Sequence, residues 1–153
     1  MITQGTLFDI EQYRDAISID RSNENCRIGA AIEMAFALKV YQMGYDVFMP
    51  WGHAQKADLI VRKHPFLAKS VQVKKATPKS NVSWHISTST KKRTASSGAT
   101  WTNYETGDFD ILAAYVSELD CWALWTINEI AGKSSVQWNK FSAIRNNFDL
   151  LDF

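Results

Sequence analysis

The chain has 153 residues, 46% of them hydrophobic and 22% charged, with a formal net charge of +1 at pH 7. This composition excludes a disordered or fibrous chain and is typical of a single globular domain, here residues 1–153, that can bury a sizeable core. No stretch reaches the roughly 20 apolar residues of a membrane span, and the polar N-terminus lacks the apolar run of a signal peptide. We therefore expect an intracellular, soluble protein without a membrane partner, in the cytoplasm or, if phage-encoded, in the host-cell cytoplasm.

Helical patterns dominate the first 43 residues. Apolar residues at helical spacing within residues 1–22 predict a short amphipathic helix or an N-terminal arm. A longer helix is predicted over residues 24–43, which are rich in Ala, Met and Leu and contain no Pro. Ser22 or Asn23 is suited to cap the start of this helix, and Gly44 is suited to end it in the left-handed conformation.

Short strands are predicted after this helix. Turn residues separate four extended segments, which cover residues 45–50, 58–62, 68–76 and 82–88. In the last of them, apolar and polar residues alternate, and this pattern is typical of a half-buried strand.

The rest of the chain contains one compositionally biased segment and two further apolar strands. Residues 87–103 are mostly Ser, Thr, Ala, Gly and basic residues, so we expect a mobile basic loop there. Residues 109–116 and 121–127 predict two strands joined as a hairpin, and residues 138–147 predict a closing helix. This order of elements predicts an α+β (mixed α/β) fold in which helices pack on a mixed sheet.

The two cysteines carry little functional signal. Cys26 and Cys121 are far apart in the sequence, lack metal-type spacing, and both lie in apolar runs. We expect two buried free thiols, as in proteins of a reducing compartment.

Basic residues are concentrated in one segment of the chain. Residues 59–104 contain nine basic residues and no acidic ones, whereas the rest of the chain has eight basic and 16 acidic residues, a net charge of −8. Such segregation is typical of a protein that binds a polyanion. The residues we expect to contact DNA are Lys75, Lys79, His85, Lys91, Lys92 and Arg93. The alternatives are a solvated loop for the basic run and a solvated strand position for the histidine.

Glu33 lies on the apolar side of the predicted helix. Its neighbours at helical spacing include Phe36, Ala37 and Val40. An unpaired carboxylate on a buried stripe is costly, so this side chain needs a metal ion, a lysine or several hydrogen-bond donors. A structural ion pair or partial exposure would satisfy it equally well.

The segment around Gln72 places polar groups on one side of a strand. Alternation puts Ser70, Gln72 and Lys74 on one face and the two intervening valines on the other. A carbonyl oxygen and an ammonium group can therefore converge on one pocket, although a solvated strand face is the commoner reason for such a pattern. Asp58 opens a preceding apolar run, where an aspartate alone most often starts a strand or a turn.

These residues occur in an order that resembles the PD-(D/E)XK nuclease superfamily: a helical Glu, an Asp at the head of a strand, then a polar-X-Lys strand. The resemblance covers roughly residues 26–77, and residues 107–127 look like the family's later strands. The branch it most resembles is the small group I intron homing endonucleases that carry Gln in place of the second acid; Holliday junction resolvases have a similar layout. It implies a restriction-endonuclease-like core, a central mixed β-sheet flanked by helices. Ala57 stands where the motif has Pro.

The resemblance also implies roles for four catalytic residues. Glu33 matches the helical acid, Asp58 the motif's Asp, Gln72 the D/E position and Lys74 the Lys. The first three would hold Mg²⁺, for which Mn²⁺ is a possible substitute; the ion would activate water and polarise the phosphate. Lys74 would orient or deprotonate the water, or clamp the phosphate. Since Gln72 is neutral, only two acidic ligands remain.

The function that follows is a Mg²⁺-dependent endonuclease acting on double-stranded DNA, with a site-specific homing-type enzyme as the leading form. A Holliday junction resolvase and a restriction-type nuclease are the enzymatic alternatives. A non-catalytic DNA-binding protein on a nuclease fold, or a small protein whose basic segment binds an acidic partner, are the alternatives without catalysis. Because one pocket cuts one strand, double-strand cleavage predicts a homodimer or homotetramer.

Overall fold

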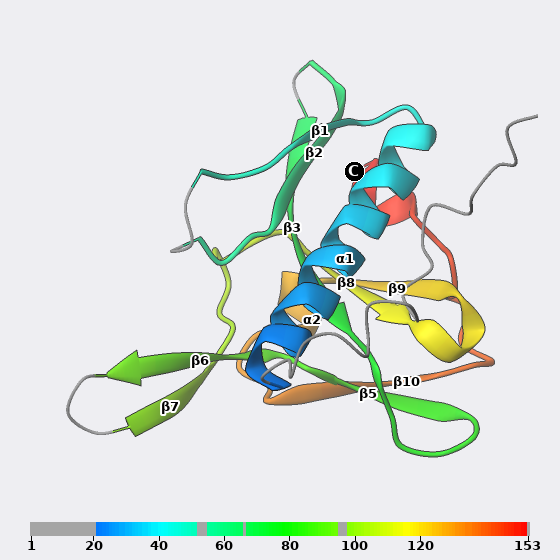
Figure 1. Cartoon of the computed structure of the whole chain (residues 1–153). Helices are drawn as coiled ribbons and strands as arrows, with labels where there is room; N and C mark the ends of the chain where they lie inside the picture. Colours follow the sequence, from blue (N-terminus) through cyan, green and yellow to red (C-terminus); the bar gives the residue numbers. More distant parts are fainter. Residues whose placement is uncertain (1–20, 52–54, 66, 95–97, 153) are drawn as a thin grey trace, which may run out of the picture.

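A five-stranded mixed sheet forms the centre of the fold (Figure 1). The strand order is β1-β2-β3-β8-β9; β3 and β8 are parallel, and the other neighbours are antiparallel. The computed structural model describes residues 21–51, 55–65, 67–94 and 98–152. The strands of this sheet are β1 (Asp46–Phe48), β2 (Leu59–His64), β3 (Leu67–Lys75), β8 (Ile111–Val116) and β9 (Cys121–Thr126).

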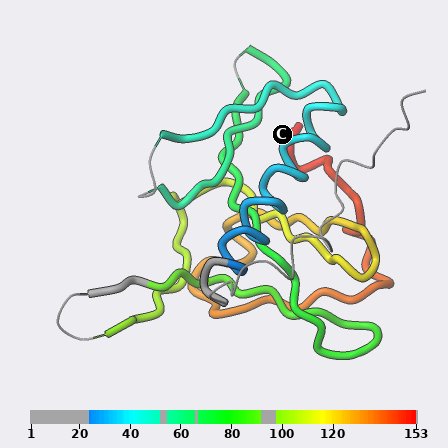
Figure 2. The backbone as a smooth tube through the Cα atoms, in the orientation of Figure 1, coloured from blue at the N-terminus to red at the C-terminus, as the bar shows by residue number. Residues whose placement is uncertain are grey.

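Two smaller sheets lie in the long connection between β3 and β8 and beyond it. One has the order β10-β5-β4, and the other is a hairpin of β6 and β7 that projects from the body of the molecule (Figures 1 and 2). Their strands are β4 (Thr77–Pro78), β5 (Ser83–Ser87), β6 (Ser89–Thr94), β7 (Gly98–Asn103) and β10 (Ser135–Asn139). The helical elements are α1 (Arg21–Gln42), α2 (Ile127–Ile130), η2 (Ser117–Leu119) and η3 (Asp149–Leu151).

Apolar residues bury both faces of the central sheet. On one face, Phe36 and Val40 of α1 pack with Val71 and Val73 of β3. On the other face, β5, β10 and α2 supply the packing partners of β8 and β9. The alternation along β3, β8 and β9 explains the two cores, because successive side chains of a strand point to opposite faces. The mixed α/β fold with a central mixed sheet covered by helices is therefore confirmed.

The helix and most of the strands form where the sequence predicts them. Helix α1 spans Arg21–Gln42. Gly44 ends it with a φ of +90°, a conformation that glycine adopts without the strain of a side chain. The prediction of a cap at Ser22 or Asn23 is wrong, because both residues lie inside the helix. The predicted arm within residues 1–22 falls outside the described residues up to position 20.

Residues 89–103 differ from the irregular loop that their composition predicts. Strands β6 and β7 pair antiparallel, with Ser89 opposite Asn103 and Thr94 opposite Gly98. Threonine-rich strands favour extended backbone because a β-branched side chain fits a pleated surface. The polar composition of this segment therefore does not exclude regular strand structure.

The predicted closing helix over residues 138–147 is also wrong. Strand β10 runs to Asn139, and turns follow it as far as residue 147. Trp138 is the direct partner of Trp84 on β5, and their ring centroids are 5.4 Å apart. This cross-strand packing decides the conformation, because a buried aromatic pair outweighs local helical propensity.

The two cysteines differ in burial. Cys121 is buried in β9 as expected, whereas Cys26 is exposed on α1, so its predicted burial is wrong. Among the described residues, no helix is long and apolar enough to cross a membrane.

Candidate active site

Asp58 directly precedes β2 and lies beside β3 in the central sheet. Its backbone N–H donates to the carbonyl oxygen of Val71 at 2.9 Å, so the ladder between the two strands extends to this residue. Its carboxylate oxygen Oδ2 accepts a hydrogen bond from the backbone N–H of Val73 at 2.7 Å. Strand β3 therefore fixes both the backbone and the side chain of Asp58.

Gln72 donates to the same carboxylate oxygen of Asp58 as the backbone of Val73 does. Its side chain is only 8% exposed, and its Nε2 donates to Oδ2 of Asp58 and to the carbonyl oxygen of Val73 at 3.2 Å. A direct hydrogen bond thus joins the side chains of Asp58 and Gln72, which are 14 residues apart in the sequence. The amide supplies a donor that a second carboxylate at this position would lack.

Glu33 approaches the same place from α1. Partial burial raises the pKa of its carboxyl, the negative charge of Asp58 raises it further, and the positive charge of Lys74 lowers it. The helix carries Glu33 there because Phe36 and Val40, one and two turns further along, are completely buried against the sheet. Glu33 is itself only partly buried, at the edge of the predicted apolar stripe.

The pKa of the Asp58 carboxyl is also shifted by burial and by neighbouring groups. Burial raises the pKa of its carboxyl, and this effect is opposed by the N–H of Val73, the charge of Lys74 and the amide of Gln72. Glu33, Asp58, Gln72 and Lys74 are referred to below as the Asp58 site. Partial burial makes the negative charges of Glu33 and Asp58 costly, and a cation bound between them would offset that cost.

The oxygen donors of the Asp58 site fit a hard divalent cation. Carboxylate and amide oxygens are the ligands that Mg²⁺ takes, and Mg²⁺ commonly keeps several waters beside one or two carboxylates. Among the described residues, no group of three or more His, Cys, Asp and Glu side chains gathers at one place. A cation here would therefore rest on two carboxylates and a neutral oxygen.

Ser70, the third polar residue on this strand face, does not join the site. Its backbone N–H and its hydroxyl both donate to Oδ2 of Asp110 at 2.7 Å. Asp110 precedes β8 as Asp58 precedes β2, so the two aspartates lie on opposite sides of β3. Sequence reasoning missed Asp110, although an aspartate directly before an apolar strand was the available signal.

Lys74 lies over the aromatic ring of Tyr104. Its Nζ lies 5.4 Å from the ring centroid of Tyr104. Tyr104 is 2% exposed and packs edge-to-face on Phe109, with centroids 4.8 Å apart. No spacing rule connects positions 74 and 104, so only the fold brings them together.

The residues expected to contact DNA are spread over several elements. Lys75 is exposed at the end of β3, and Lys79 is exposed after β4. His85 is exposed on β5, between the buried residues Trp84 and Ile86. These three residues do not join the Asp58 site.

The basic run Lys91, Lys92 and Arg93 lies on β6 of the projecting hairpin. Lys91 is the direct strand partner of Trp101, and its Nζ lies 6.0 Å from the ring centroid.

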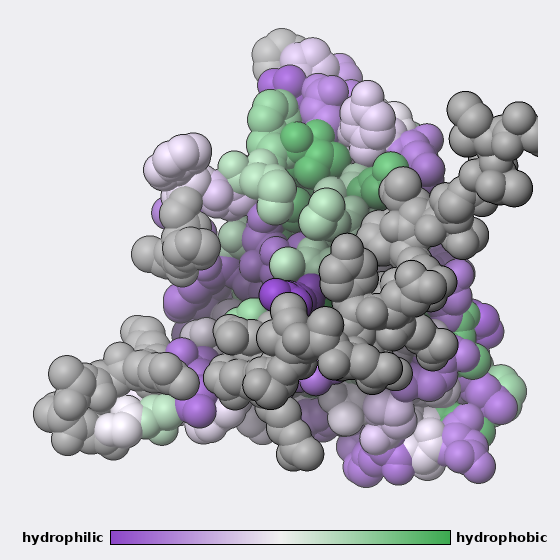
Figure 3. Space-filling view, in the orientation of Figure 1, coloured by the Kyte–Doolittle hydropathy of each residue, from purple (hydrophilic) through white to green (hydrophobic). Residues whose placement is uncertain are grey.

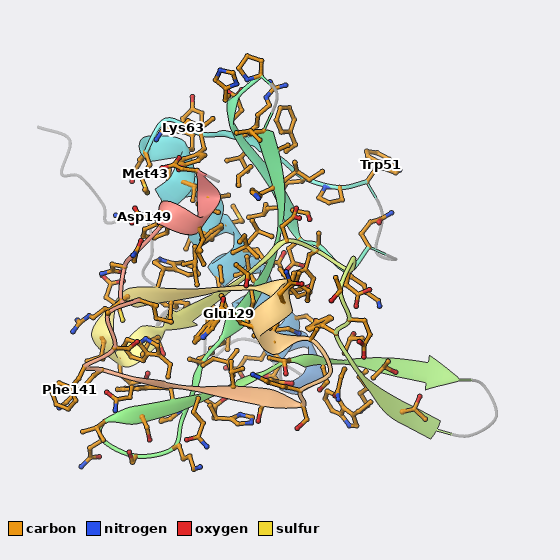
Figure 4. All side chains as sticks on the ribbon, turned by 180° about the vertical axis from the view of Figure 1, so that it is seen from behind. Met43, Trp51, Lys63, Glu129, Phe141 and Asp149 are labelled. Carbon is orange, nitrogen blue, oxygen red and sulfur yellow. The ribbon has the colours of Figure 1, made fainter. Side chains whose placement is uncertain are left out.

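The loop that carries Trp51 projects from the same side of the molecule as the hairpin (Figures 1 and 4). Trp51 is 99% exposed and Trp101 is 65% exposed. Both aromatic rings are therefore available to a ligand.

A hollow of about 440 Å³ is lined by residues of α1, β8 and β9 together with Asp120 and Asn146, and by none of the four residues of the Asp58 site.

Comparison with known proteins agrees with this geometry. Residues 24–143 match the family model described as PD-(D/E)XK endonuclease. The chain is 39% identical over 114 residues to Protein 5.3 of Escherichia phage T7, covering 74% of this chain and 90% of that protein. Its structure is similar to that of a bacterial homing endonuclease, I-Ssp6803I, with a TM-score of 0.63 and 19% identity over 82% of this chain and 84% of the other.

Proposed function

The chain belongs to the PD-(D/E)XK endonuclease family, and on that premise we propose that it is a Mg²⁺-dependent endonuclease that hydrolyses phosphodiester bonds of double-stranded DNA. The observation that carries this proposal is the arrangement of the Asp58 site. Four groups that match the family's motif are linked there: Gln72 donates a hydrogen bond to Asp58, and the charges of Asp58 and Lys74 both act on Glu33. The order of these residues in the sequence is the order of the motif.

Glu33 and Asp58 hold the cation in this proposal. Mg²⁺, or Mn²⁺ in its place, supplies a Lewis acid that polarises the phosphoryl oxygen and makes a water more acidic. Gln72 would support the ion by rotating its amide so that the oxygen replaces the Nε2 group now bonded to Asp58. Val73 would keep its N–H on Asp58 Oδ2 and so fix the carboxylate during that change.

Lys74 acts on the phosphate or the water. Its ammonium is a compact charge with three donors on a flexible stem, which suits it to clamp a phosphate oxygen or to orient the attacking water. It lies two residues after Gln72 on β3, on the same side of the strand. The positive charges of Lys74 and of the cation would offset the negative charge that grows on the phosphate in the transition state.

DNA binding in this proposal uses the basic segment outside the site. Lys91, Lys92 and Arg93 on the hairpin contact phosphates, with weaker contributions from Lys75, Lys79 and His85. Hydrogen bonds and ion pairs to the backbone set position and affinity without reading sequence. A site-specific, homing-type substrate is the first choice because the fold is that of a homing endonuclease; a Holliday junction and a restriction-type site are the alternatives.

The chain acts as a homodimer or a homotetramer in this proposal. One Asp58 site cuts one strand, so two copies are needed for double-strand cleavage. The outer side of α1 supports such an assembly, because Met34, Leu38 and Tyr41 recur at helical spacing there and are 67%, 58% and 67% exposed. Hydrophobic residues gather on the face that carries α1 and β1 (Figure 3).

The experiment that tests the proposal compares three DNA substrates. Linear, supercoiled and four-way-junction DNA are incubated with the protein in Mg²⁺ or in EDTA, and cuts are mapped at nucleotide resolution. Cleavage in Mg²⁺ alone supports the enzyme, and the preferred substrate identifies its type. Fluorescence anisotropy with the same DNA distinguishes a protein that binds without cutting from one that does not bind.

A further inference from the structure

Lys74 has an aromatic ring as its nearest fixed partner. In the described part of the chain, its ammonium forms no hydrogen bond and no ion pair, although the charges of Glu33 and Asp58 act across the same site. The contact that remains is with Tyr104, whose ring centroid is 5.4 Å from Nζ. This distance lies within the range of a cation–π interaction, which draws a cation to the ring face.

The ring of Tyr104 is held rigidly. It is 2% exposed and meets the ring of Phe109 edge-to-face at an interplanar angle of 77°. The backbone of Tyr104 is fixed on both sides, because its N–H donates to Thr88 at 3.0 Å and its carbonyl oxygen accepts from Gly132 at 2.9 Å. Tyr104 is therefore a fixed surface against which a flexible side chain can settle.

We propose that Tyr104 is a positioning residue that holds the Lys74 ammonium for catalysis by a cation–π contact. The inference rests on the proposed function, because it assigns a role only if Lys74 acts on the phosphate. A lysine beside two carboxylates tends to form an ion pair with one of them, which would occupy its donors and neutralise a metal ligand. A ring attracts the ammonium without accepting its N–H groups in strong hydrogen bonds, so those donors stay available to the substrate.

Tyr104 also directly follows β7, and Thr88 directly precedes β6. The hydrogen bond between these two residues closes the base of the hairpin that carries Lys91. The residue that positions Lys74 is therefore part of the base of the hairpin that the proposed function places on DNA.

The test replaces Tyr104 by Phe, by Leu, and by phenylalanines carrying one to five ring fluorines. Fluorine withdraws charge from the ring face with little change in size, so a cation–π contact weakens stepwise along the series. Single-turnover cleavage at saturating DNA should be within about twofold of wild type for Tyr104→Phe and roughly tenfold slower for Tyr104→Leu. The logarithm of the rate should fall steadily with each added fluorine.

A control and a second readout separate this role from simple packing. Pentafluorophenylalanine at Phe148, a buried ring in the core on the α1 face of the sheet, should leave the rate unchanged. In metal-free protein, NMR of ¹³Cε-labelled lysine should show the Lys74 methylene protons shifted upfield by the ring in wild type and Tyr104→Phe but not in Tyr104→Leu. A flat fluorine series in an enzyme that needs Lys74 would overturn the inference, whereas wild-type protein that cuts no DNA would overturn the proposed function.

Discussion

The Asp58 site and the β6–β7 hairpin differ in how they are held in place. At the site, β3 forms hydrogen bonds with both the backbone and the carboxylate of Asp58, and α1 packs over the same sheet. The hairpin pairs only with itself along its six-residue strands, and Lys91 and Trp101 are both exposed. The Asp58 site thus lies at the central sheet, and the basic run Lys91, Lys92 and Arg93 lies on a projection.

This difference matches the two tasks of the proposed enzyme. Stabilising a transition state requires donors and ligands placed before the reaction, which a buried strand pair provides. Holding a phosphate backbone requires only charge within reach, and it tolerates movement of long side chains. Substitutions in the two regions should therefore separate cleavage from binding.

The largest expected effect comes from the site itself. Glu33→Ala, Asp58→Ala and Lys74→Ala should each slow single-turnover cleavage by roughly 10²-fold or more, since each removes a group that acts on the charge of the transition state. Affinity for the same DNA, measured by anisotropy in Ca²⁺, should change by less than about threefold because most of the proposed phosphate contacts lie elsewhere. Near wild-type cutting by the Asp58 variant would remove this residue from the mechanism.

The hairpin should show the opposite pattern. Replacing Lys91, Lys92 and Arg93 together by Ala should weaken binding to all sequences and reduce the slope of log K against log salt by up to roughly 2.7, at about 0.9 per phosphate contact. The cleavage rate at saturating DNA should stay near that of wild type. As a matched control, the single substitution Lys140→Ala removes a charge outside the hairpin; an equal loss of slope in that variant would show that the effect is general.

Acidification should affect the site before ordinary carboxylates titrate. Burial raises the pKa of both Asp58 and Glu33 above their usual values of 3.8 and 4.5. Between those values and the raised ones, the folded state binds more protons than the unfolded state, so the free energy of unfolding without metal falls as pH rises. Thermal unfolding across this pH window should show that decline in wild type and a smaller one in Asp58→Asn.

The same protonation should oppose metal binding. Mg²⁺ should raise the melting temperature most above the raised pKa values, where both carboxyls are ionised, and hardly at all below them. An Mg²⁺ effect that is constant over this range would show that neither carboxyl holds the ion.

The smallest expected effect comes from Gln72→Glu. The change adds a third anionic oxygen but replaces the Nε2 donor to Asp58 by a like charge. The metal-free variant should melt below wild type, and Mg²⁺ or Mn²⁺ should stabilise it more than they stabilise wild type. Gln72→Met, which has a similar shape but no ligand oxygen, serves as the control, and the same ions should stabilise it less than they stabilise wild type.

Local patterns predicted the parts of the structure that local physics decides. Apolar periodicity predicted helix α1, strands β2 and β3, and the β8–β9 hairpin. The order of the motif residues identified Asp58, Gln72 and Lys74 as site candidates. The convergence of Glu33 with them depended on the helix packing over β3, which the apolar neighbours Phe36 and Val40 already indicated.

The remaining features depend on contacts between distant segments. Trp138 lies in a strand because Trp84 packs against it, and no helical propensity predicts that partner. The ring of Tyr104 reaches Lys74 only through the placement of the residues around the hairpin base. Cys26 is exposed because it lies near the start of α1, where every residue from 24 to 31 is exposed or partly exposed.

Nicking of supercoiled plasmid tests the central claim most directly. Wild-type protein and Asp58→Ala, purified in parallel, are incubated with plasmid in Mg²⁺, in EDTA, and in EDTA followed by excess Mg²⁺. We predict nicked or linear product from wild type in Mg²⁺, none in EDTA, recovery when Mg²⁺ is restored, and no product from Asp58→Ala under any condition. Cutting in EDTA, or equal cutting by both proteins, would contradict a metal-dependent nuclease centred on Asp58.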